Sequence, residues 1–233
     1  DGLNPIKADL AKVDAIKKLA VLQKYLDDAT KRSDNPFYGW GVYGDLKNSK
    51  MNAVYLGDAS LGLGRDYYQK DSPKNTETIE EYKKYVAQVL TELGYKDAAS
   101  VAAQIVDFEK KMAKTLLTNE QIRDSNLQYN PKTLPELKAL VKNIDLPKYL
   151  ANVGVKTDKV IIGELGYYKN LDTFLTEKNI PLIKDYIKFN LVSGSAGYLS
   201  QKLDDMKFDF YSKYLQGQKE QRALNKRALG LIN

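Results

Sequence analysis

The apolar residues of this chain recur mainly at three- and four-residue steps, the repeat of an amphipathic α-helix. After Asp97, for example, the recurring positions are Val101, Ile105, Phe108, Met112 and Leu116. The same repeat predicts helices from Asp14 to Asp28, from Thr76 to the Gly94 that closes it, from Asp97 to Leu116, from Gly166 to Lys178 and from Gln218 to Leu231, and one apolar run of more than thirty residues from Pro181.

Side chains suited to helix ends predict shorter helices between these. Thr118 and Gln121 have the spacing of a capping box, in which each side chain bonds to the other residue's backbone. Thr133 is placed to cap a helix that runs through Val141, and 146–153 has the pattern of another. These segments extend the helical character of the chain.

Two stretches break the helical repeat. Between Tyr38 and Gly57, aromatic and β-branched residues flank a polar turn at 47–50, which predicts a β-hairpin. The β-branched run 159–163 is too short for a helix and predicts a further strand. The expected fold is therefore mainly α: a single helical lobe over residues 1–233 with a small β-hairpin (38–57) and a short extra strand (159–163).

The composition fits such a lobe. The chain has 233 residues, of which 43% are hydrophobic and 28% charged, enough for a sizeable core. Its 36 basic and 30 acidic residues, net +6, are interleaved rather than gathered in a basic stripe, so no nucleic-acid partner is expected. No segment approaches the roughly 20 apolar residues of a membrane-spanning helix, so no membrane span is expected in this chain.

The first residues and the absence of Cys bear on the compartment. The chain begins at Asp1 without a basic segment followed by an apolar one, so we expect any signal peptide to lie upstream. A chain without Cys fits a bacterial cytoplasm as well as a disulfide-free periplasmic or surface protein.

Histidine is absent, and this limits the chemistry more than any motif does. Imidazole is the commonest zinc ligand and the usual general base near neutral pH. Ser-His-Asp and Cys-His catalysis are excluded, as is the His-Glu-x-x-His motif that holds zinc in zincin peptidases. The sequence therefore predicts no catalytic and no metal-binding residue in this chain.

Carboxylate pairs are the remaining candidates for catalysis without His. The visible pairs, Asp204-Asp205 and Glu80-Glu81, are neighbours in sequence, and adjacent helical residues point about 100° apart. Neither pair can converge on one substrate by itself, so both are expected on solvated helix faces. Gly62-Leu63-Gly64 lacks the Lys-Ser/Thr of a phosphate-binding loop and is expected to form a turn.

Two features of the apolar run from Pro181 have alternative interpretations. The small residues at 193–197 indicate a kink or a place where another backbone comes close, and packing is the favoured reason. The aromatic residues Phe208, Phe210, Tyr211 and Tyr214 can form a ligand wall, although stripes at helical spacing usually face a core.

The stretch 61–68 is too rich in glycine for a regular element and predicts an ordered loop. Arg65 and Asp66 stand there among aromatic residues. In one interpretation, the planar guanidinium of Arg65 binds a peptide carboxylate or carbonyl. In the commoner alternative, Arg65 and Asp66 tie the loop to neighbouring backbone.

Several of these segments, in this order, resemble the N-terminal half of the neprilysin and endothelin-converting-enzyme family of zinc endopeptidases, which includes bacterial PepO-like enzymes. Residues 61–68 are similar to the family's Gly-Leu-Gly-Leu-Pro-x-Arg-Asp-Tyr-Tyr signature, with Gly64 where Pro is common. The other landmarks are Tyr55-Leu56, Ile105 with Phe108-Glu109, Arg123-Asp124 with Tyr129-Asn130, Asp185-Tyr186-Ile187 with Leu199-Ser200, and the closing segment 226–233.

The resemblance implies an all-helical lobe that faces a catalytic lobe across a water-filled cavity and restricts access to short peptides. In the family, the zinc ligands and the segment that binds substrate backbone lie later in the sequence, so no catalytic or zinc residue is assigned here. Contacts with the substrate chamber, or a loop-ordering role, are considered for Arg65, Asp66, Arg123 and Asp124.

The resemblance also implies partners and a location. Zinc is expected in the parent enzyme, and no cofactor in this chain. The implied partners are the C-terminal catalytic lobe of the same polypeptide and, in the full enzyme, peptide substrates. A periplasmic or extracellular location is implied, with or without a membrane anchor upstream, and the cytoplasm stays open.

Two other functions fit the residues. A stand-alone helical module that binds a peptide or protein would need an exposed apolar groove, and a stop codon soon after Asn233 would support it. An enzyme with a His-independent carboxylate site would need two carboxyl groups about 5 to 10 Å apart in one pocket.

Overall fold

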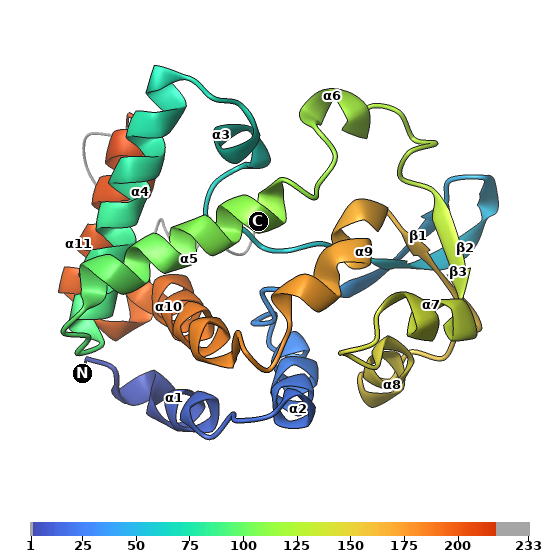
Figure 1. The fold of residues 1–233 in the computed structure, drawn as a ribbon, viewed down its shortest axis with the longest axis horizontal. Coiled ribbons are helices and arrows are strands. Elements are labelled where there is room, and N and C mark those ends of the chain that lie inside the picture. Colours follow the sequence, from blue (N-terminus) through green and yellow to red (C-terminus); the bar gives the residue numbers. More distant parts are fainter. Residues whose placement is uncertain (1, 218–233) are drawn as a thin grey trace.

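The computed structural model describes residues 2–217 and confirms a mainly α fold with a small β part (Figure 1). Its helices are α1 (Lys7–Asp14), α2 (Leu19–Thr30), α3 (Arg65–Gln69), α4 (Pro73–Glu92), α5 (Ala98–Ala113), α6 (Asn119–Ile122), α7 (Leu134–Leu140), α8 (Leu146–Asn152), α9 (Leu165–Phe174), α10 (Ile180–Leu199) and α11 (Gln201–Lys207). A short 3-10 helix, η1 (Asn4–Ile6), precedes α1, and a π-helix, η2 (Phe208–Leu215), follows α11. The helix predicted at 218–231 lies outside the described residues.

The described strands are β1 (Trp40–Asp45), β2 (Asn48–Leu56), β3 (Asn130–Thr133) and β4 (Lys159–Ile162), in one mixed sheet of order β1-β2-β4-β3. β1 and β2 form the predicted hairpin, and β4 is the predicted extra strand, parallel to β2. The short β3 was not predicted, because its sequence, Asn-Pro-Lys-Thr, lacks the apolar pattern of a strand. Its Pro131 also lacks the N–H that a central strand needs. The structure resolves the conflict by placing β3 at the edge of the sheet, antiparallel to β4.

The hairpin turn lies two residues earlier than predicted. Leu46 and Lys47 form the turn, and residues 48–50 already belong to β2. The reason is local: Asp45 Oδ1 accepts a hydrogen bond from the Lys47 N–H over 2.8 Å, and an Asp side chain that bonds two residues ahead favours a turn there. The Tyr55 hydroxyl donates to Gly44 O over 3.0 Å and so fixes the end of the hairpin.

The helices and the sheet gather at different ends of the molecule (Figure 1). α4, α5, α10 and α11 pack against one another, and α1 packs along α10. The sheet lies at the other end beside α7 and α8, with α9 between the two groups in the view. One continuous cluster of buried residues joins them, and its largest fully buried side chains are mainly tyrosines: Tyr38, Tyr68, Tyr82, Tyr85, Tyr149, Tyr167, Tyr168 and Tyr186.

The predicted helix start at Asp14 is wrong. Asp14 is the last residue of α1, a helix that was not predicted, and α2 begins at Leu19. Residues 15–18 leave the helical path, and this places Ile16 fully inside the core. Asp14 instead forms an ion pair with Lys188 of α10.

The start of α4 is also earlier than predicted. Ser72, not Thr76, caps the helix: its hydroxyl accepts a hydrogen bond from the Asn75 N–H over 3.0 Å, and Pro73 fills the first helical position, where no N–H is needed. At the other end Gly94 adopts φ +93°, and the Tyr95 N–H donates to Leu90 O. This left-handed glycine closes the helix as predicted.

Other predicted helix ends gave mixed outcomes. The capping boxes at Thr118 and Thr133 form and start α6 and α7. α9 ends at Phe174, short of the predicted Lys178. Residues 61–64 form the predicted irregular loop, but residues 65–69 fold into the short α3. No glycine follows Gly64 in this segment, and the Lys70 N–H donates the helical hydrogen bond to Asp66 O.

The long apolar run breaks at Ser200 rather than at the small residues 193–197. Ser200 is extended, with φ −160° and ψ 158°, and its hydroxyl caps α11 by accepting from the Leu203 N–H. α10 continues through 193–197, and an added Cβ at Gly194 would meet nothing within 4 Å, so no other backbone comes close there. Phe210 is buried and stacks on Tyr85 with ring centroids 5.7 Å apart, which confirms the core interpretation for that residue.

The two carboxylate pairs differ. Glu80 and Glu81 lie on the outer face of α4 in ion pairs with Lys83 and Lys84, as predicted. The prediction is wrong for Asp204, which is only 9% exposed. After the break at Ser200, α11 packs back onto α4 and α10, and this turns Asp204 inward toward Gly197.

Gly94→Ala should destabilise the protein by about 1 kcal/mol, because a Cβ disfavours the positive φ of the helix end. The measurement is the free energy of unfolding from urea denaturation followed by circular dichroism. Gly194→Ala is the matched control: Gly194 has helical backbone with open space at its Cβ, so alanine there should stabilise by up to about 1 kcal/mol. Equal effects at the two sites would mean that the positive φ of Gly94 does not set the cost of a side chain there.

Candidate functional site

The loop of residues 57–64 joins β2 to α3 and is held mainly by side chains from distant helices. Within residues 2–217, its backbone makes two hydrogen bonds to distant backbone: the Gly57 N–H donates to Gly39 O and the Ser60 N–H donates to Pro36 O, both over 2.9 Å. Tyr168 of α9 donates to Gly57 O, and Tyr211 of η2 donates to Gly62 O over 3.0 Å. Helices from the second half of the chain therefore set the path of this loop.

Glu109 of α5 is the centre of this arrangement. It is fully buried, and Oε2 accepts a hydrogen bond from the Gly62 N–H over 2.8 Å. The hydroxyls of Tyr68 and Tyr186 donate to the same carboxyl over 2.8 and 2.6 Å. Burial raises the pKa of Glu109 above its ordinary value, and the hydrogen bonds from Tyr186 and Gly62 oppose that rise.

Gly62 is required at this point of the loop by close packing. A Cβ added there would lie 1.9 Å from the hydroxyl oxygen of Tyr82, closer than any real contact. The glycine thus lets the loop lie against the Tyr82 ring while its N–H and C=O bond to Glu109 and Tyr211. Gly62 therefore serves packing, whereas a Cβ at Gly64 would make only ordinary contacts with Tyr67.

Arg65 ties three chain segments together. Its Nη1 donates to Leu117 O and to Glu164 Oε2, both over 2.7 Å, and its Nη2 lies 3.3 Å from Asp58 Oδ2. Glu164 also accepts a hydrogen bond from the Leu117 N–H over 2.8 Å. Both terminal nitrogens of the guanidinium are therefore directed at groups of this chain.

The other predicted site residues do not join Arg65 in one site. Asp66 is half-buried beside it, and its Oδ1 has no hydrogen-bond partner within residues 2–217. Arg123 and Asp124 are exposed after α6, where Asp124 Oδ1 accepts from the Asn126 N–H over 3.0 Å. Across the described part of the chain, no hydrogen bond or ion pair links Arg123 or Asp124 to Arg65 or Asp66.

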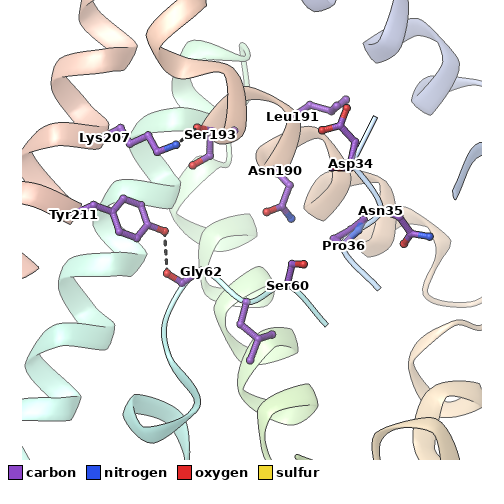
Figure 2. A pocket seen from close by; sticks show the side chains of 13 residues that line it. Asp34, Asn35, Pro36, Ser60, Gly62, Asn190, Leu191, Ser193, Lys207 and Tyr211 are labelled. Carbon is purple, nitrogen blue, oxygen red and sulfur yellow. Dashed lines mark hydrogen bonds between the residues drawn. The ribbon is translucent and has the colours of Figure 1, made fainter. Parts of the chain in front are cut away.

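A pocket of about 420 Å³ adjoins the loop (Figure 2). It lies between the loop, the end of α2, the middle of α10 and the start of η2. Its lining residues are Ser33, Asp34, Asn35, Pro36, Ser60, Leu61, Gly62, Asn190, Leu191, Ser193, Gly194, Lys207 and Tyr211. Figure 2 shows Lys207 and Asp34 on opposite sides, with the Asn190 side chain directed between them.

The chemistry of this pocket suits binding more than bond cleavage. The Lys207 ammonium donates to Ser193 O over 2.8 Å, and burial lowers its pKa. Burial raises the pKa of Asp34, while the nearby Arg32 opposes the rise. The lining therefore offers one amine, one carboxyl group, amides and hydroxyls to a polar ligand, but it brings no second carboxyl group beside Asp34.

The sequence held a signal for the buried centre that was not used. Glu109 stands in the apolar stripe of α5, between Ile105 and Met112 at four- and three-residue steps, and a carboxylate on a buried helix face is unusual enough to mark a site. The partners Tyr68, Tyr186 and Tyr211 carried no such signal. A tyrosine in an amphipathic stripe looks the same whether or not its hydroxyl has a partner.

Comparison with known proteins agrees on one family. Residues 1–233 match the N-terminal family model of Peptidase family M13. Endothelin-converting enzyme 1 of Cavia porcellus is 28% identical over 180 residues, which cover 73% of this chain and 24% of that protein. The neutral endopeptidase of Lactococcus lactis subsp. cremoris is 24% identical over 230 residues, which cover 97% of this chain and 36% of that protein.

Solved structures show the same fold. The open-state structure of Mycobacterium tuberculosis zinc metalloprotease ZMP1 has a TM-score of 0.89 at 22% identity, and the match covers 99% of this chain and 36% of that one. PepO from Lactobacillus rhamnosis has a TM-score of 0.82 at 19% identity, with coverages of 98% and 37%. This chain thus spans about a quarter to just over a third of the proteins it matches.

Arg65→Met should destabilise the protein by about 2–4 kcal/mol, because it leaves Glu164 and Asp58 without their cation in a poorly solvated place. Urea denaturation measures the loss. Lys70→Met is the control, since Lys70 pairs with Glu120 at the surface over 3.0 Å and the loss of this exposed pair should cost much less stability than the loss of Arg65. Similar stability of both variants would show that the Arg65 contacts are weak.

Glu109→Gln tests the buried carboxyl through pH. Because the folded state raises the pKa of Glu109, the unfolded chain releases that proton first, and the wild type loses stability as pH rises from 4.5 through the folded pKa. The free energy of unfolding of the wild type relative to Glu109→Gln should therefore fall as the pH rises above 4.5, the ordinary pKa of a Glu side chain.

Glu120→Gln is the control for that titration. Lys70 lowers the pKa of Glu120, so in this case the wild type should gain stability relative to the variant as pH rises. A difference between wild type and Glu109→Gln that does not vary with pH would mean that Glu109 is as well solvated in the folded state as in the unfolded chain.

Proposed function

Because this chain belongs to peptidase family M13, we propose that it is the non-catalytic cap lobe of a zinc metalloendopeptidase that cleaves short peptides. One combination carries the proposal: the family match extends over all 233 residues, yet the sequence contains no histidine. A peptidase region of this length without imidazole contributes shape rather than a metal centre.

The donor set of this chain does not fit a catalytic zinc ion. There is neither His nor Cys in the sequence, and no group of three or more Asp or Glu side chains within residues 2–217 could hold a metal ion. Zinc therefore belongs, in this proposal, to the part of the parent polypeptide outside the chain. That part is the main partner of the lobe.

The proposed role is to build one wall of the substrate chamber and to exclude folded proteins by size. The loop 57–64 supports this role, because Glu109 and three tyrosines, Tyr168, Tyr186 and Tyr211, bond to its backbone and fix its path. The adjoining pocket offers Lys207, Asp34 and Asn190 to the polar groups of a peptide. A wall needs such a stable, polar, unreactive surface.

The roles of the predicted site residues follow from their places. Arg65 acts by ordering the loop, since its guanidinium is directed at Leu117, Glu164 and Asp58. Asp66 stands beside it. Arg123 and Asp124 are exposed and remain available for a contact with the chamber or with the catalytic part.

The location of the parent protein is proposed as periplasmic or extracellular, on the strength of the family resemblance. Within residues 2–217, no helix combines the length and apolar character needed to cross a membrane. A membrane anchor elsewhere in the parent protein is compatible with the proposal.

The first test compares the isolated chain with its full-length parent. With zinc added, the full-length protein should hydrolyse short peptides in a chelator-sensitive reaction, and the isolated 233-residue chain should show no turnover. Fluorogenic peptides measure both rates. Robust chelator-sensitive hydrolysis by the isolated chain would reject the non-catalytic role, and an inactive full-length protein would reject the peptidase assignment.

The second measurement addresses size. Unstructured peptides of increasing length that carry one cleavable sequence are compared with a folded protein that displays the same sequence in a loop. The full-length enzyme should lose kcat/KM as the substrate grows, and the folded protein should resist cleavage until it is unfolded. Equal rates for the peptide and the folded protein would contradict exclusion by size.

A further inference from the structure

Exposed apolar side chains gather on the β1–β2 hairpin. The large apolar residues that are well exposed within residues 2–217 are Val21, Trp40, Val42, Tyr43, Leu46, Met51, Leu127 and Tyr198. Five of them lie between residues 40 and 51, and Leu127 follows Asn126, whose side chain accepts a hydrogen bond from Lys47 of the hairpin turn. A concentration of this kind marks an interaction surface more often than a solvated loop.

The exposed residues occupy both faces of the hairpin. Tyr43 lies opposite Ala53 and beside Tyr55 on one face, whereas Trp40 and Val42 point to the other, because side chains alternate along a strand. Tyr43 is 66% exposed and Val42 is 51% exposed. The hairpin therefore extends beyond the core of this chain, as Figure 1 shows at the end of the sheet.

The outer edge of β1 is also unprotected. β1 is the end strand in the order β1-β2-β4-β3, and in the described sheet it pairs with β2 alone. Natural edge strands are usually guarded by Lys, Pro or an irregularity. The sequence Trp-Gly-Val-Tyr-Gly-Asp has no Lys or Pro, and the register shifts only at its last step, between Gly44 and Asp45.

The exposure is not the result of a loose turn. Asp45 accepts from the Lys47 N–H, and the Tyr55 hydroxyl bonds to both Gly44 O and the Leu46 N–H over 3.0 and 3.1 Å. The tip is therefore fixed, and it presents its apolar side chains in one defined arrangement. A pre-ordered surface loses little entropy when a partner covers it.

We infer that this hairpin, residues 40–56, is the surface on which the part of the parent polypeptide outside residues 1–233 docks. The inference rests on the proposed function and names the place of contact. The match covers only 36% of the neutral endopeptidase of Lactococcus lactis. If the parent protein has a similar length, most of its chain lies outside residues 1–233 and is available as a covalently attached partner. A covalently attached partner acts at an effective concentration near the millimolar range and outcompetes a second copy in dilute solution.

Radical footprinting of the full-length parent tests the inference. Tyr43 and Tyr198 are the same residue type and are 66% and 73% exposed in this chain, so each is the other's reference. After normalisation to the urea-unfolded protein, labelling of Tyr43 should be slower than labelling of Tyr198 by about five-fold or more, as expected for a contact that excludes water. Equal labelling of the two tyrosines would overturn the inference.

Dilution separates an attached partner from a second copy. Protection of Tyr43 should stay constant between about 10 µM and about 0.1 µM protein, because an intramolecular contact does not depend on concentration. Protection that disappears on dilution would assign the hairpin to a contact between copies and overturn the inference.

Cross-linking identifies the occupant. The chain contains no Cys, so Tyr43→Cys and Tyr198→Cys each place one thiol within residues 1–233 for a photoactivatable cross-linker. In the full-length protein, Tyr43→Cys should give cross-linked peptides from outside residues 1–233 of the same molecule, and Tyr198→Cys should not. Cross-links from Tyr43→Cys only within residues 1–233 would contradict the inference.

Measuring the peptidase activity of the same preparations distinguishes a failure of the docking surface from a failure of the proposed peptidase function. An active, chelator-sensitive enzyme with fully labelled Tyr43 would refute the docking surface and leave the proposed function standing. An inactive protein with protected Tyr43 would refute the peptidase assignment and leave the contact in place.

Discussion

The structure depends on one constraint: a buried backbone without regular partners must find hydrogen bonds from side chains. The loop 57–64 contains partly buried backbone of this kind around Gly62 and Leu63, although Gly57, Ser60 and Gly64 are exposed. It meets the constraint with a carboxylate on α5 and tyrosine hydroxyls on α9, α10 and η2, which bond to Gly57, Ser60 and Gly62. The same bonds hold distant helices together, because each helix that supports the loop is also packed against its neighbours. Tyrosine suits this task, since its ring fills the core while its hydroxyl reaches the loop.

Among the groups that bond to the loop, the buried carboxyl of Glu109 has the largest desolvation cost. Desolvation disfavours the charged form of Glu109, and the raised pKa of this side chain reflects that cost. Glu109 nevertheless accepts from one backbone N–H and from the hydroxyls of Tyr68 and Tyr186. An apolar residue there would remove the acceptor of the Gly62 N–H and of the Tyr68 hydroxyl, and it would leave Tyr186 with Ser60 O alone. The carboxyl therefore specifies one path for the loop, and Gly62 lets that path run against the ring of Tyr82.

Local signals were predictable from sequence, and contacts made by folding were not. The capping box at Thr118 and the helix cap at Thr133 involve residues three apart, and both were predicted correctly. The strand β3 was missed because only its pairing with β4 makes it extended, and the inward position of Asp204 follows from the packing of α11. In the candidate site, Arg65 stood out as a charge among aromatics, but its partner Glu164 lies 99 residues away, and no spacing rule connects them. The single lobe over residues 1–233 stays a prediction.

The need of polar backbone groups for hydrogen-bond partners is met differently in the interior and at the surface of the lobe. Glu109 and Arg65 are themselves bonded to groups of this chain, so these two side chains have little capacity left for a substrate. The hairpin differs: within the described residues, the outer edge of β1 has no partner strand, and the side chains of Trp40, Val42 and Tyr43 are 40 to 66% exposed. Charged groups that are already paired resist change, whereas an uncovered edge gains from any complementary surface. The capacity of this lobe for new contacts therefore lies at the end of its sheet, away from the buried polar centre that gives the lobe its shape.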